Sequence, residues 1–336
     1  MTDRFRPDGG DTGDGRGGAM DEPDGVASTQ RYLRAKRTVD DRALSREVFD
    51  TFAAALDGPT RLIDVAAGVG TMLERLLRWE ALPAEADYTM VDIDPANVAA
   101  AAEYLPSVAR SLGYTVSSRE TSAALFPDAT AAFTLTLRKD GRTVRVQAGT
   151  ADVFEFVSRV SGGRTWDTLV AGAFLDVAPG PDAVESLFRL VPGGTAYFPI
   201  TFDGATRFLP TDDRAFERRL ERRWHAGMRE GDDPNEPRAG SRAPEWVRAA
   251  GGSVAAVGGS DWVVRPTESG YPAEEAYFLR HVLGLVEGSL VDDPALSTDR
   301  VRGWLRTRRA QLDAAELTYI AHNLDVVAAV GPNERG

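Results

Sequence analysis

The sequence predicts an α/β fold with a doubly wound, mostly parallel sheet and an antiparallel closing strand. Two observations predict it. Short, mainly apolar segments alternate with stretches of helical periodicity along residues 60–202, as expected for strands that are covered on both faces. Such strand–helix alternation favours a parallel sheet with helices packed on each side.

The elements follow in a regular order. Apolar residues at helical spacing predict a first helix over residues 44–56, which Gly58-Pro59 ends. Strand patterns lie at residues 62–65, 88–93, 143–148, 168–174 and 195–202, and helical ones at 72–79, 95–112 and 182–190. Residues 133–138 and 143–147 alternate with period two around a Lys-Asp-Gly turn, which predicts a hairpin. The remaining predictions are a helix at 211–230, a strand at 253–264, helices at 273–290 and 299–312, and a strand near 317–321.

Composition limits the function. Acidic residues outnumber basic ones by 51 to 39, and a formal net charge of −12 repels a phosphate backbone, so we expect no nucleic-acid partner. The absence of cysteine excludes disulfides, thiolate metal sites and a cysteine nucleophile. No apolar stretch reaches the roughly 18 residues that span a bilayer, and the N-terminus lacks an apolar signal segment. We therefore expect a cytoplasmic protein without a membrane span.

Residues 1–28 are rich in Gly, Asp and Arg and predict a disordered tail. Within this tail, residues 8–15 alternate Asp with Gly but lack the spacing and the distal Glu of an EF-hand loop. We expect no metal site.

The turn after the first strand predicts nucleotide binding. Residues 62–71 read Leu-Ile-Asp-Val-Ala-Ala-Gly-Val-Gly-Thr, and small residues at such a strand end let a ligand approach the backbone. A dinucleotide fingerprint requires Gly-x-Gly-x-x-Gly, but the sixth position from Gly68 is Leu73, which is too bulky for that close packing. A Tyr-x-x-x-Lys spacing at Tyr32 and Lys36 precedes the turn instead of following it, and we attribute it to chance.

Three later strands are followed by carboxylates. Asp92 ends the second strand, where ligands cross an open α/β sheet, whereas Asp94 precedes a proline and predicts a helix N-cap. Asp152 follows the third core strand and also suits a cap for the next helical turn. Asp176 lies beyond the ligand-side end of the fourth strand. Asp167 lies at its opposite end, and we assign it no chemistry.

These motifs resemble those of class I S-adenosylmethionine-dependent methyltransferases, a Rossmann-like superfamily. The first motif matches at Asp64, Ala66, Gly68 and Gly70, with Ala66 in place of the family's usual first glycine. The acid at the end of the second strand, the Pro-Gly-Gly turn at 192–194 and a late closing pair of strands match in order and spacing. The resemblance implies a seven-stranded Rossmann-like sheet, S-adenosyl-L-methionine as cofactor and methyl transfer to a small-molecule acceptor, such as a metabolite, a lipid or a quinone-like compound.

The resemblance also implies roles for individual residues. Asp92 would bind the ribose hydroxyls, and Asp152 would face the adenine amino group. The implied cofactor-binding residues are Asp64, Ala66, Ala67, Gly68, Gly70, Asp92, Ile93, Asp152, Val153 and Ala171. The implied organisation is an N-terminal helical lid at 29–58, a cofactor-binding core at 59–202, a cap or substrate insert at 203–252, and closing strands and helices of the same domain at 253–330.

An activated methyl donor requires mainly that the acceptor nucleophile is held in line with the methyl group. The candidate substrate residues are Asp176, Phe202, Asp203 and His225. Of these His225 is the candidate general base, although a lone histidine is more often structural. Four arginines at 218, 219, 222 and 223 suit an acidic substrate, or a solvated face that pairs with Glu217 and Glu221.

Two other functions stay open. One is an NAD(P)-dependent oxidoreductase, and the other is a non-catalytic, cofactor-binding regulatory protein, which the unusual Ala66 keeps in consideration. DNA methylation is disfavoured because the Asn/Asp-Pro-Pro-Tyr loop and cysteine are both absent.

Overall fold

The computed structural model describes residues 25–119, 125–160, 162–229 and 235–332. The helices are α1 (Gly25–Ala43), α2 (Arg46–Ala54), α3 (Thr71–Arg78), α4 (Pro95–Ser111), α5 (Val153–Val160), α6 (Pro181–Phe188), α7 (Arg214–Gly227), α8 (Ala239–Ala249), α9 (Glu275–Leu290) and α10 (Thr298–Asp313). The strands are β1 (Thr60–Val65), β2 (Glu85–Asp92), β3 (Thr115–Arg119), β4 (Ala132–Lys139), β5 (Arg142–Thr150), β6 (Thr168–Val170), β7 (Thr195–Leu209), β8 (Ser253–Gly259), β9 (Trp262–Val264) and β10 (Thr318–Ala329).

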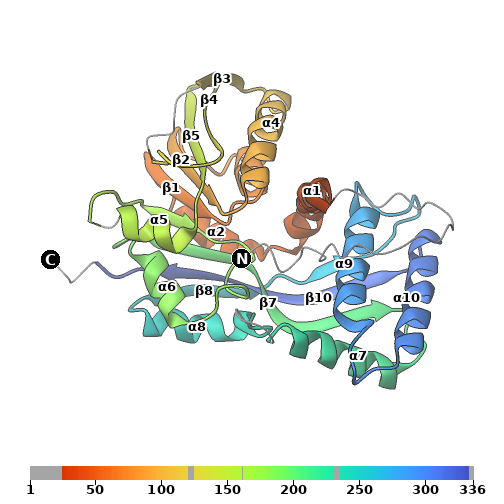
Figure 1. The fold of residues 1–336 in the computed structure, drawn as a ribbon. Coiled ribbons are helices and arrows are strands. Elements are labelled where there is room, and N and C mark those ends of the chain that lie inside the picture. The colour runs from red at the N-terminus through yellow and green to blue at the C-terminus, as the bar shows by residue number, and fades with distance from the viewer. Residues whose placement is uncertain (1–24, 120–124, 161, 230–234, 333–336) are drawn as a thin grey trace.

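The described strands form one sheet in the order β3-β4-β5-β2-β1-β6-β7-β10-β8, with β9 beside β10 (Figure 1). The central strands run parallel to one another in the order β5, β2, β1, β6 and β7. Strand β10 lies antiparallel between β7 and β8. The predicted α/β fold class is confirmed, including the antiparallel closing strand, but the described sheet has ten strands instead of the seven that the resemblance implies. The predicted hairpin is also confirmed, because β4 pairs antiparallel with β5.

Helices cover both faces of the parallel part of the sheet. Successive residues of a strand point to opposite faces, so Leu62 of β1 packs in a core with α2, α3 and α4, whereas Ile63 packs in a second core with α5, α6 and α8. Both side chains are fully buried. This two-sided burial explains why the central strand segments are mainly apolar.

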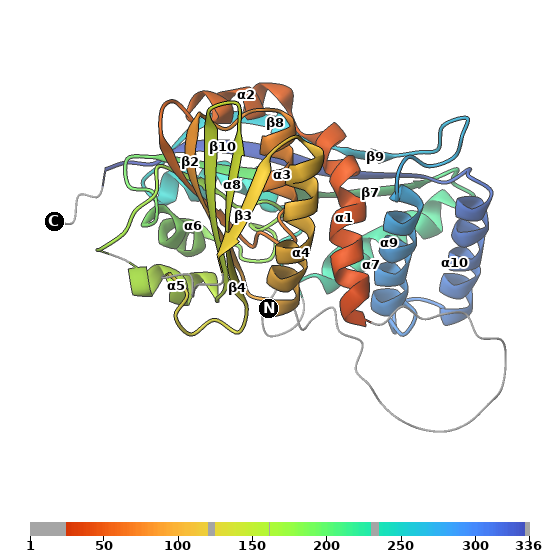
Figure 2. The ribbon, with the colours of Figure 1, turned by 90° about the horizontal axis from the view of Figure 1, so that it is seen from above.

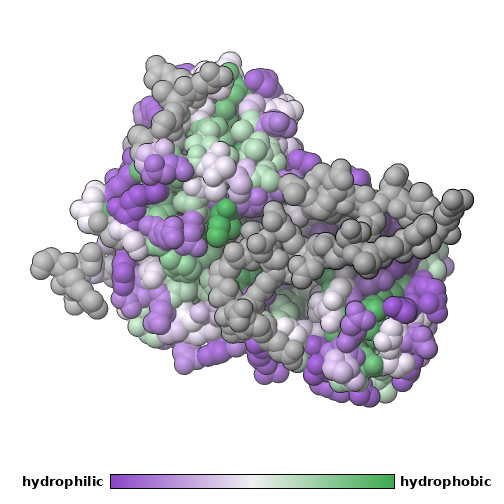
Figure 3. Space-filling view, viewed as in Figure 1, coloured by the Kyte–Doolittle hydropathy of each residue, from purple (hydrophilic) through white to green (hydrophobic). Residues whose placement is uncertain are grey.

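A third core lies beyond the parallel sheet, where β7 and β10 continue as a long antiparallel pair. Helices α1, α7, α9 and α10 pack around it, and α1 lies between α4 and α9 in both ribbon views (Figures 1 and 2). Figure 3 shows mostly hydrophilic side chains over the outer edges of α7 and α10, in keeping with their many arginines.

Several predicted boundaries are wrong. The fifth core strand does not end at residue 202, because β7 runs to Leu209 and pairs with β10 along its length. The range 203–252 is therefore not one insert: α7 belongs to the third core, and α8, which was not predicted, covers the parallel sheet beside α6. The predicted strand at 253–264 is divided into β8 and β9.

The predicted tail overlaps the structure, since α1 begins at Gly25. Residues 1–24, which include the acidic run at 8–15, lie outside the described residues. In the described part of the chain, no helix has both the length and the apolar character that a membrane crossing requires.

Candidate functional site

The sheet reverses its winding direction between β1 and β6. The chain moves outward from β1 to β2 and β5, and then returns to β6 on the other side of β1. In open α/β sheets, ligands bind at such a switch point, outside the carboxyl ends of the strands. The residues that follow β1, β2 and β6 therefore border the candidate site.

The turn after β1 has a left-handed backbone at alternate residues. The angle φ is 52° at Ala66, 56° at Gly68 and 84° at Gly70, which immediately precedes α3. A Cβ atom on Gly70 would lie 2.9 Å from Leu105 and 3.1 Å from Met90, so both the backbone angle and the packing require glycine there. Ala66 tolerates an angle that is uncommon for residues with a side chain.

Asp92 connects the ends of β1 and β2. Its Oδ2 accepts a hydrogen bond from the Gly68 amide at 2.7 Å, and its Oδ1 accepts bonds from the Asp94 amide at 2.9 Å and the Asn97 side chain at 3.1 Å. Burial raises the pKa of Asp92, and these three donors oppose the rise by stabilising the carboxylate. A carboxylate has about four acceptor sites, so one site remains for a ligand hydroxyl. Asp94 caps α4 as predicted, through the Ala96 amide.

Helix α1 covers the same turn. The Leu33 side chain would lie 3.2 Å from a Cβ atom on Gly68. Helix α1 therefore contacts the face of the turn at which the sequence predicts a ligand. Gln30 donates to Asn97 Oδ1 at 2.8 Å, and Asn97 in turn donates to Asp92. A chain of hydrogen bonds thus joins α1 to the carboxylate at the end of β2.

Asp64 does not border the candidate site at the strand ends. It is buried in the first core, where its carboxylate accepts a hydrogen bond from the Tyr88 hydroxyl at 2.8 Å. Burial raises the pKa of Asp64 to about 7, and the bond from Tyr88 opposes this rise. Asp64 therefore supports the turn from beneath.

The other predicted cofactor residues lie at the neighbouring strand ends. Asp152 Oδ1 accepts bonds from the amides of Phe154 at 2.8 Å and Glu155 at 3.0 Å, and so caps α5. Ala67 and Ala171 are buried, and their amides bond to Val91 O at 3.1 Å and Tyr197 O at 2.9 Å. Ile93 is partly exposed, and Val153 is buried at the start of α5.

Asp176, after β6, differs from Asp92 in its hydrogen bonding. Its Oδ1 atom is shielded from solvent and has no hydrogen-bond partner among the described residues. Burial raises the pKa of Asp176 to about 6, and the positive charge of Lys36 on α1 opposes the rise. An orphaned buried acceptor is costly in a folded protein, so this oxygen is suited to a donor that arrives with a ligand.

The remaining candidate substrate residues form a separate group. The His225 ring lies 5.3 Å from the Phe202 ring, and its Nε2 atom is 3.2 Å from Thr206 Oγ1. Burial lowers the pKa of His225 and so favours the neutral imidazole. Asp203 accepts a hydrogen bond from the Ser241 amide at 2.8 Å, which ties it to the first turn of α8.

The acidic residues of α7 pair with partners outside their own helix. Glu217 contacts Arg308 of α10, and Glu221 contacts Arg207 of β7. The predicted pairing of these acids with the arginines of α7 is therefore not what the structure shows.

Sequence reasoning missed a polar layer beneath α1. Lys36 pairs with Asp40 at 2.8 Å, and Asp40 accepts a bond from the Trp262 indole at 2.9 Å. The neighbouring Asp41 pairs with the buried Arg75 of α3 at 2.6 Å. The spacing of Lys36 and Asp40 predicts the first contact, but no sequence signal identifies partners that are far apart in the chain.

Comparisons with known proteins add the following. No protein-family model and no curated protein sequence matches the chain. A putative sarcosine dimethylglycine methyltransferase from Galdieria sulphuraria is 11% identical, with a TM-score of 0.42, over 91% of this chain and 98% of its own. A SAM-dependent methyltransferase from Thiobacillus denitrificans, solved with S-adenosyl-L-homocysteine, is 15% identical, with a TM-score of 0.40, over 93% and 100%.

A third similar structure is a cyclopropane-fatty-acyl-phospholipid synthase-like protein from Lactobacillus casei. It is 9% identical, with a TM-score of 0.43, over 90% of this chain and 98% of its own. These identities and TM-scores are low, so the function is inferred below from the chain's own residues.

Proposed function

We propose that the chain is an S-adenosyl-L-methionine-dependent methyltransferase that acts on a small-molecule acceptor. One observation carries the proposal: the Gly68 amide and the Asp92 carboxylate meet at 2.7 Å, at the point where the sheet reverses its winding. A glycine turn next to a strand-end carboxylate is suited to a nucleoside, because the backbone admits the ligand closely and the acid accepts ribose hydroxyls.

Two features favour an adenosyl sulfonium over a dinucleotide. Leu73 is fully buried at the position where a dinucleotide fingerprint requires a small residue for close packing. Acidic groups at the strand ends, Asp92 and Asp176, also suit a ligand with a positive sulfur and an ammonium group better than one with a pyrophosphate. The oxidoreductase alternative is therefore not favoured.

The chain's own residues would bind and orient the two reactants. Asp92 has capacity for one ribose hydroxyl and gains a second site if Asn97 turns away. Leu33 must move for a ligand to reach the face of Gly68, so we assign α1 the role of a lid that opens and closes. Bound S-adenosyl-L-methionine supplies an activated methyl group, and the protein contributes mainly the alignment of the acceptor.

The acceptor would lie on the β6 side of the crevice. Asp176 would offer an acceptor hydroxyl or amine its Oδ1 atom, which has no partner among the described residues, and His225 and Phe202 would border the pocket farther along β7. Whether the acceptor is a metabolite, a lipid or a quinone-like compound stays open, and the predicted cytoplasmic location stays a prediction.

Calorimetric titration tests the proposal. We expect S-adenosyl-L-homocysteine to bind the wild-type chain and NADH not to bind. Asp92→Ala should weaken S-adenosyl-L-homocysteine by about tenfold or more, because hydrogen bonds to a charged group contribute about 1.5–3 kcal/mol. The matched control is Asp94→Asn, which removes the same charge two residues away and retains a good N-cap.

Two results would count against the proposal. A wild-type chain that does not bind S-adenosyl-L-homocysteine contradicts the cofactor, and unchanged affinity in Asp92→Ala contradicts the ribose assignment. Binding without methyl transfer to any member of a broad acceptor panel would instead support the non-catalytic alternative.

A further inference from the structure

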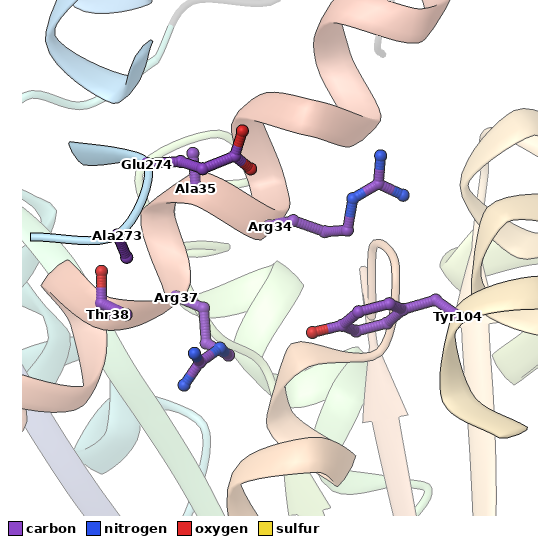
Figure 4. Close-up of a pocket in the computed structure, with 7 residues that line it drawn as sticks. All are labelled: Arg34, Ala35, Arg37, Thr38, Tyr104, Ala273 and Glu274. Atoms are coloured by element: carbon purple, nitrogen blue, oxygen red, sulfur yellow. The ribbon is translucent and has the colours of Figure 1, made fainter. Parts of the chain in front are cut away.

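A cavity of about 230 Å³ lies beside α1, on the flank that faces α4. Its walls come from α1, α4 and the residues that lead into α9 (Figure 4). The lining residues are Arg34, Ala35, Arg37, Thr38, Tyr104, Ala273 and Glu274. This cavity is distinct from the Gly68 turn, because Leu33, which covers that turn, is not among the residues that line it.

Arg34 is the lining charge for which the described residues provide no ion pair. Figure 4 shows its side chain extending from α1 above the ring of Tyr104, and the guanidinium carbon is 5.9 Å from the ring centroid. No carboxylate in the described part of the chain forms an ion pair with Arg34. The other lining arginine, Arg37, pairs with Asp41 at 2.7 Å and with Glu74 at 3.3 Å. The lining acid, Glu274, pairs with Arg31 at 2.9 Å.

The surrounding charges leave a local positive excess. Asp41 and Glu74 are shared among arginines of α1 and α3, which are Arg37, Arg75 and Arg78. With Arg34, four guanidinium groups therefore accompany two carboxylates, in a chain whose formal net charge is −12. A cation that is partly buried and unpaired beside such a cluster attracts an anion more strongly than a solvated surface arginine does.

The wall of the cavity also positions Arg34. The Tyr104 hydroxyl donates a hydrogen bond to Glu74, and this bond holds the ring beside the guanidinium group of Arg34. Arginine donates two parallel hydrogen bonds to a carboxylate or phosphate, a geometry that lysine cannot reproduce.

We propose that this cavity is a second ligand site, in which Arg34 binds a compact oxyanion, a carboxylate or phosphate group, against Tyr104. The anion joins α1 to α4, because Arg34 belongs to the first helix and Tyr104 to the second. Arg34 lies one turn from Gln30, whose bond to Asn97 also ties α1 to α4. An occupied cavity thus stabilises α1 in its position over the Gly68 turn, whatever ligand that turn binds.

Titration calorimetry at constant ionic strength tests the site on the full-length chain, with inorganic phosphate in one series and acetate in another. We expect saturable binding of at least one anion, and the preferred one distinguishes a phosphoryl ligand from a carboxylate ligand. Arg34→Gln should weaken that binding by about tenfold or more, since bonds between charged groups are the strong ones. Arg34→Lys keeps the charge and should give an intermediate loss.

The control is Arg280→Gln, which removes an equal charge from an exposed residue of α9 that pairs with Asp313 and does not line the cavity. Binding in this variant should change by less than about threefold. The absence of saturable binding to the wild type would overturn the proposal, as would equal losses in Arg280→Gln and Arg34→Gln, because equal losses indicate a diffuse charge effect. Circular dichroism checks that each variant is folded.

Discussion

Asp92 and Asp176 lie near the carboxyl ends of two parallel strands, but they differ in the hydrogen bonds that their side chains accept. Asp92, the last residue of β2, accepts three hydrogen bonds from its own chain, whereas Asp176, after β6, has a buried oxygen without a partner among the described residues. The first is organised by its own chain, whereas the second has an acceptor oxygen that no described residue satisfies. In the proposed methyltransferase, the nucleoside side would be preformed and the acceptor side would be completed by its substrate.

The largest expected effect concerns the stability that each carboxylate provides. Asp92→Ala leaves the amides of Gly68 and Asp94 without their acceptor, and we expect the free energy of unfolding to fall by about 3 kcal/mol. Asp176→Ala removes an oxygen that no described residue satisfies, so it should not lower the free energy of unfolding at neutral pH. Urea denaturation of both variants measures the difference. Equal losses would show that the two carboxylates are held alike.

The second prediction concerns pH. The pKa of Asp176 in the folded chain, about 6, lies above its ordinary value of 3.8, so the folded state binds the proton more tightly than the unfolded state does. This contribution to stability is fully present below pH 3.8 and is lost as the pH rises through about 6, by roughly 1–3 kcal/mol.

Denaturation of the wild type and of Asp176→Asn across this pH range measures that contribution. Their difference in unfolding free energy should change with pH, because other groups titrate in both proteins and cancel. A difference that stays constant with pH would mean that Asp176 is not held in a desolvated environment.

The third prediction concerns the chain of hydrogen bonds from α1 to Asp92. Gln30→Ala and Asn97→Ala should each lower the free energy of unfolding by about 1 kcal/mol. If Gln30 acts through Asn97, the double variant should lose less than the sum of the two single losses. Strict additivity in the double-mutant cycle would show that α1 and Asp92 are independent.

The smallest effect is expected at the amino-terminal ends of the parallel strands, where Arg61 at the start of β1 pairs with Asp167 just before β6 at 3.2 Å. Both side chains are exposed, so Arg61→Gln should cost less than about 1 kcal/mol in the same urea assay. A loss as large as that in Asp92→Ala would mean that carboxylates at either end of the strands stabilise this sheet to the same degree.

The sequence predicted the parallel sheet and the Gly68 turn well because both depend on local rules. A strand that is buried on both faces must be apolar throughout, and a left-handed backbone at Gly70 requires a glycine, so composition and spacing reveal them. The N-cap at Asp94 was predicted for the same reason, since the capping acid and the following proline are neighbours in the chain.

The roles of Asp64 and Asp203 could not be predicted from local sequence rules. Asp64 belongs to the motif that suggested a ligand, yet its partner is Tyr88 on the next strand. Asp203 lies in β7 and was predicted to contact a substrate. Its side chain instead accepts a hydrogen bond from the first turn of α8, a helix that the sequence did not predict. In both cases the deciding partner is distant in the chain, and its position depends on how strands and helices pack.

By itself, the amino-acid sequence determined the alternation of strands and helices, the left-handed turn after β1 and the acids that follow β2 and β6. Tertiary structure alone decided which of those acids is satisfied within the described residues, how α1 lies over the turn, and that Arg34 lies beside Tyr104 with no ion-pair partner among those residues. The physical reason is that backbone conformation follows mainly from neighbouring residues, whereas the hydration and pairing of a charge depend on every segment packed against it.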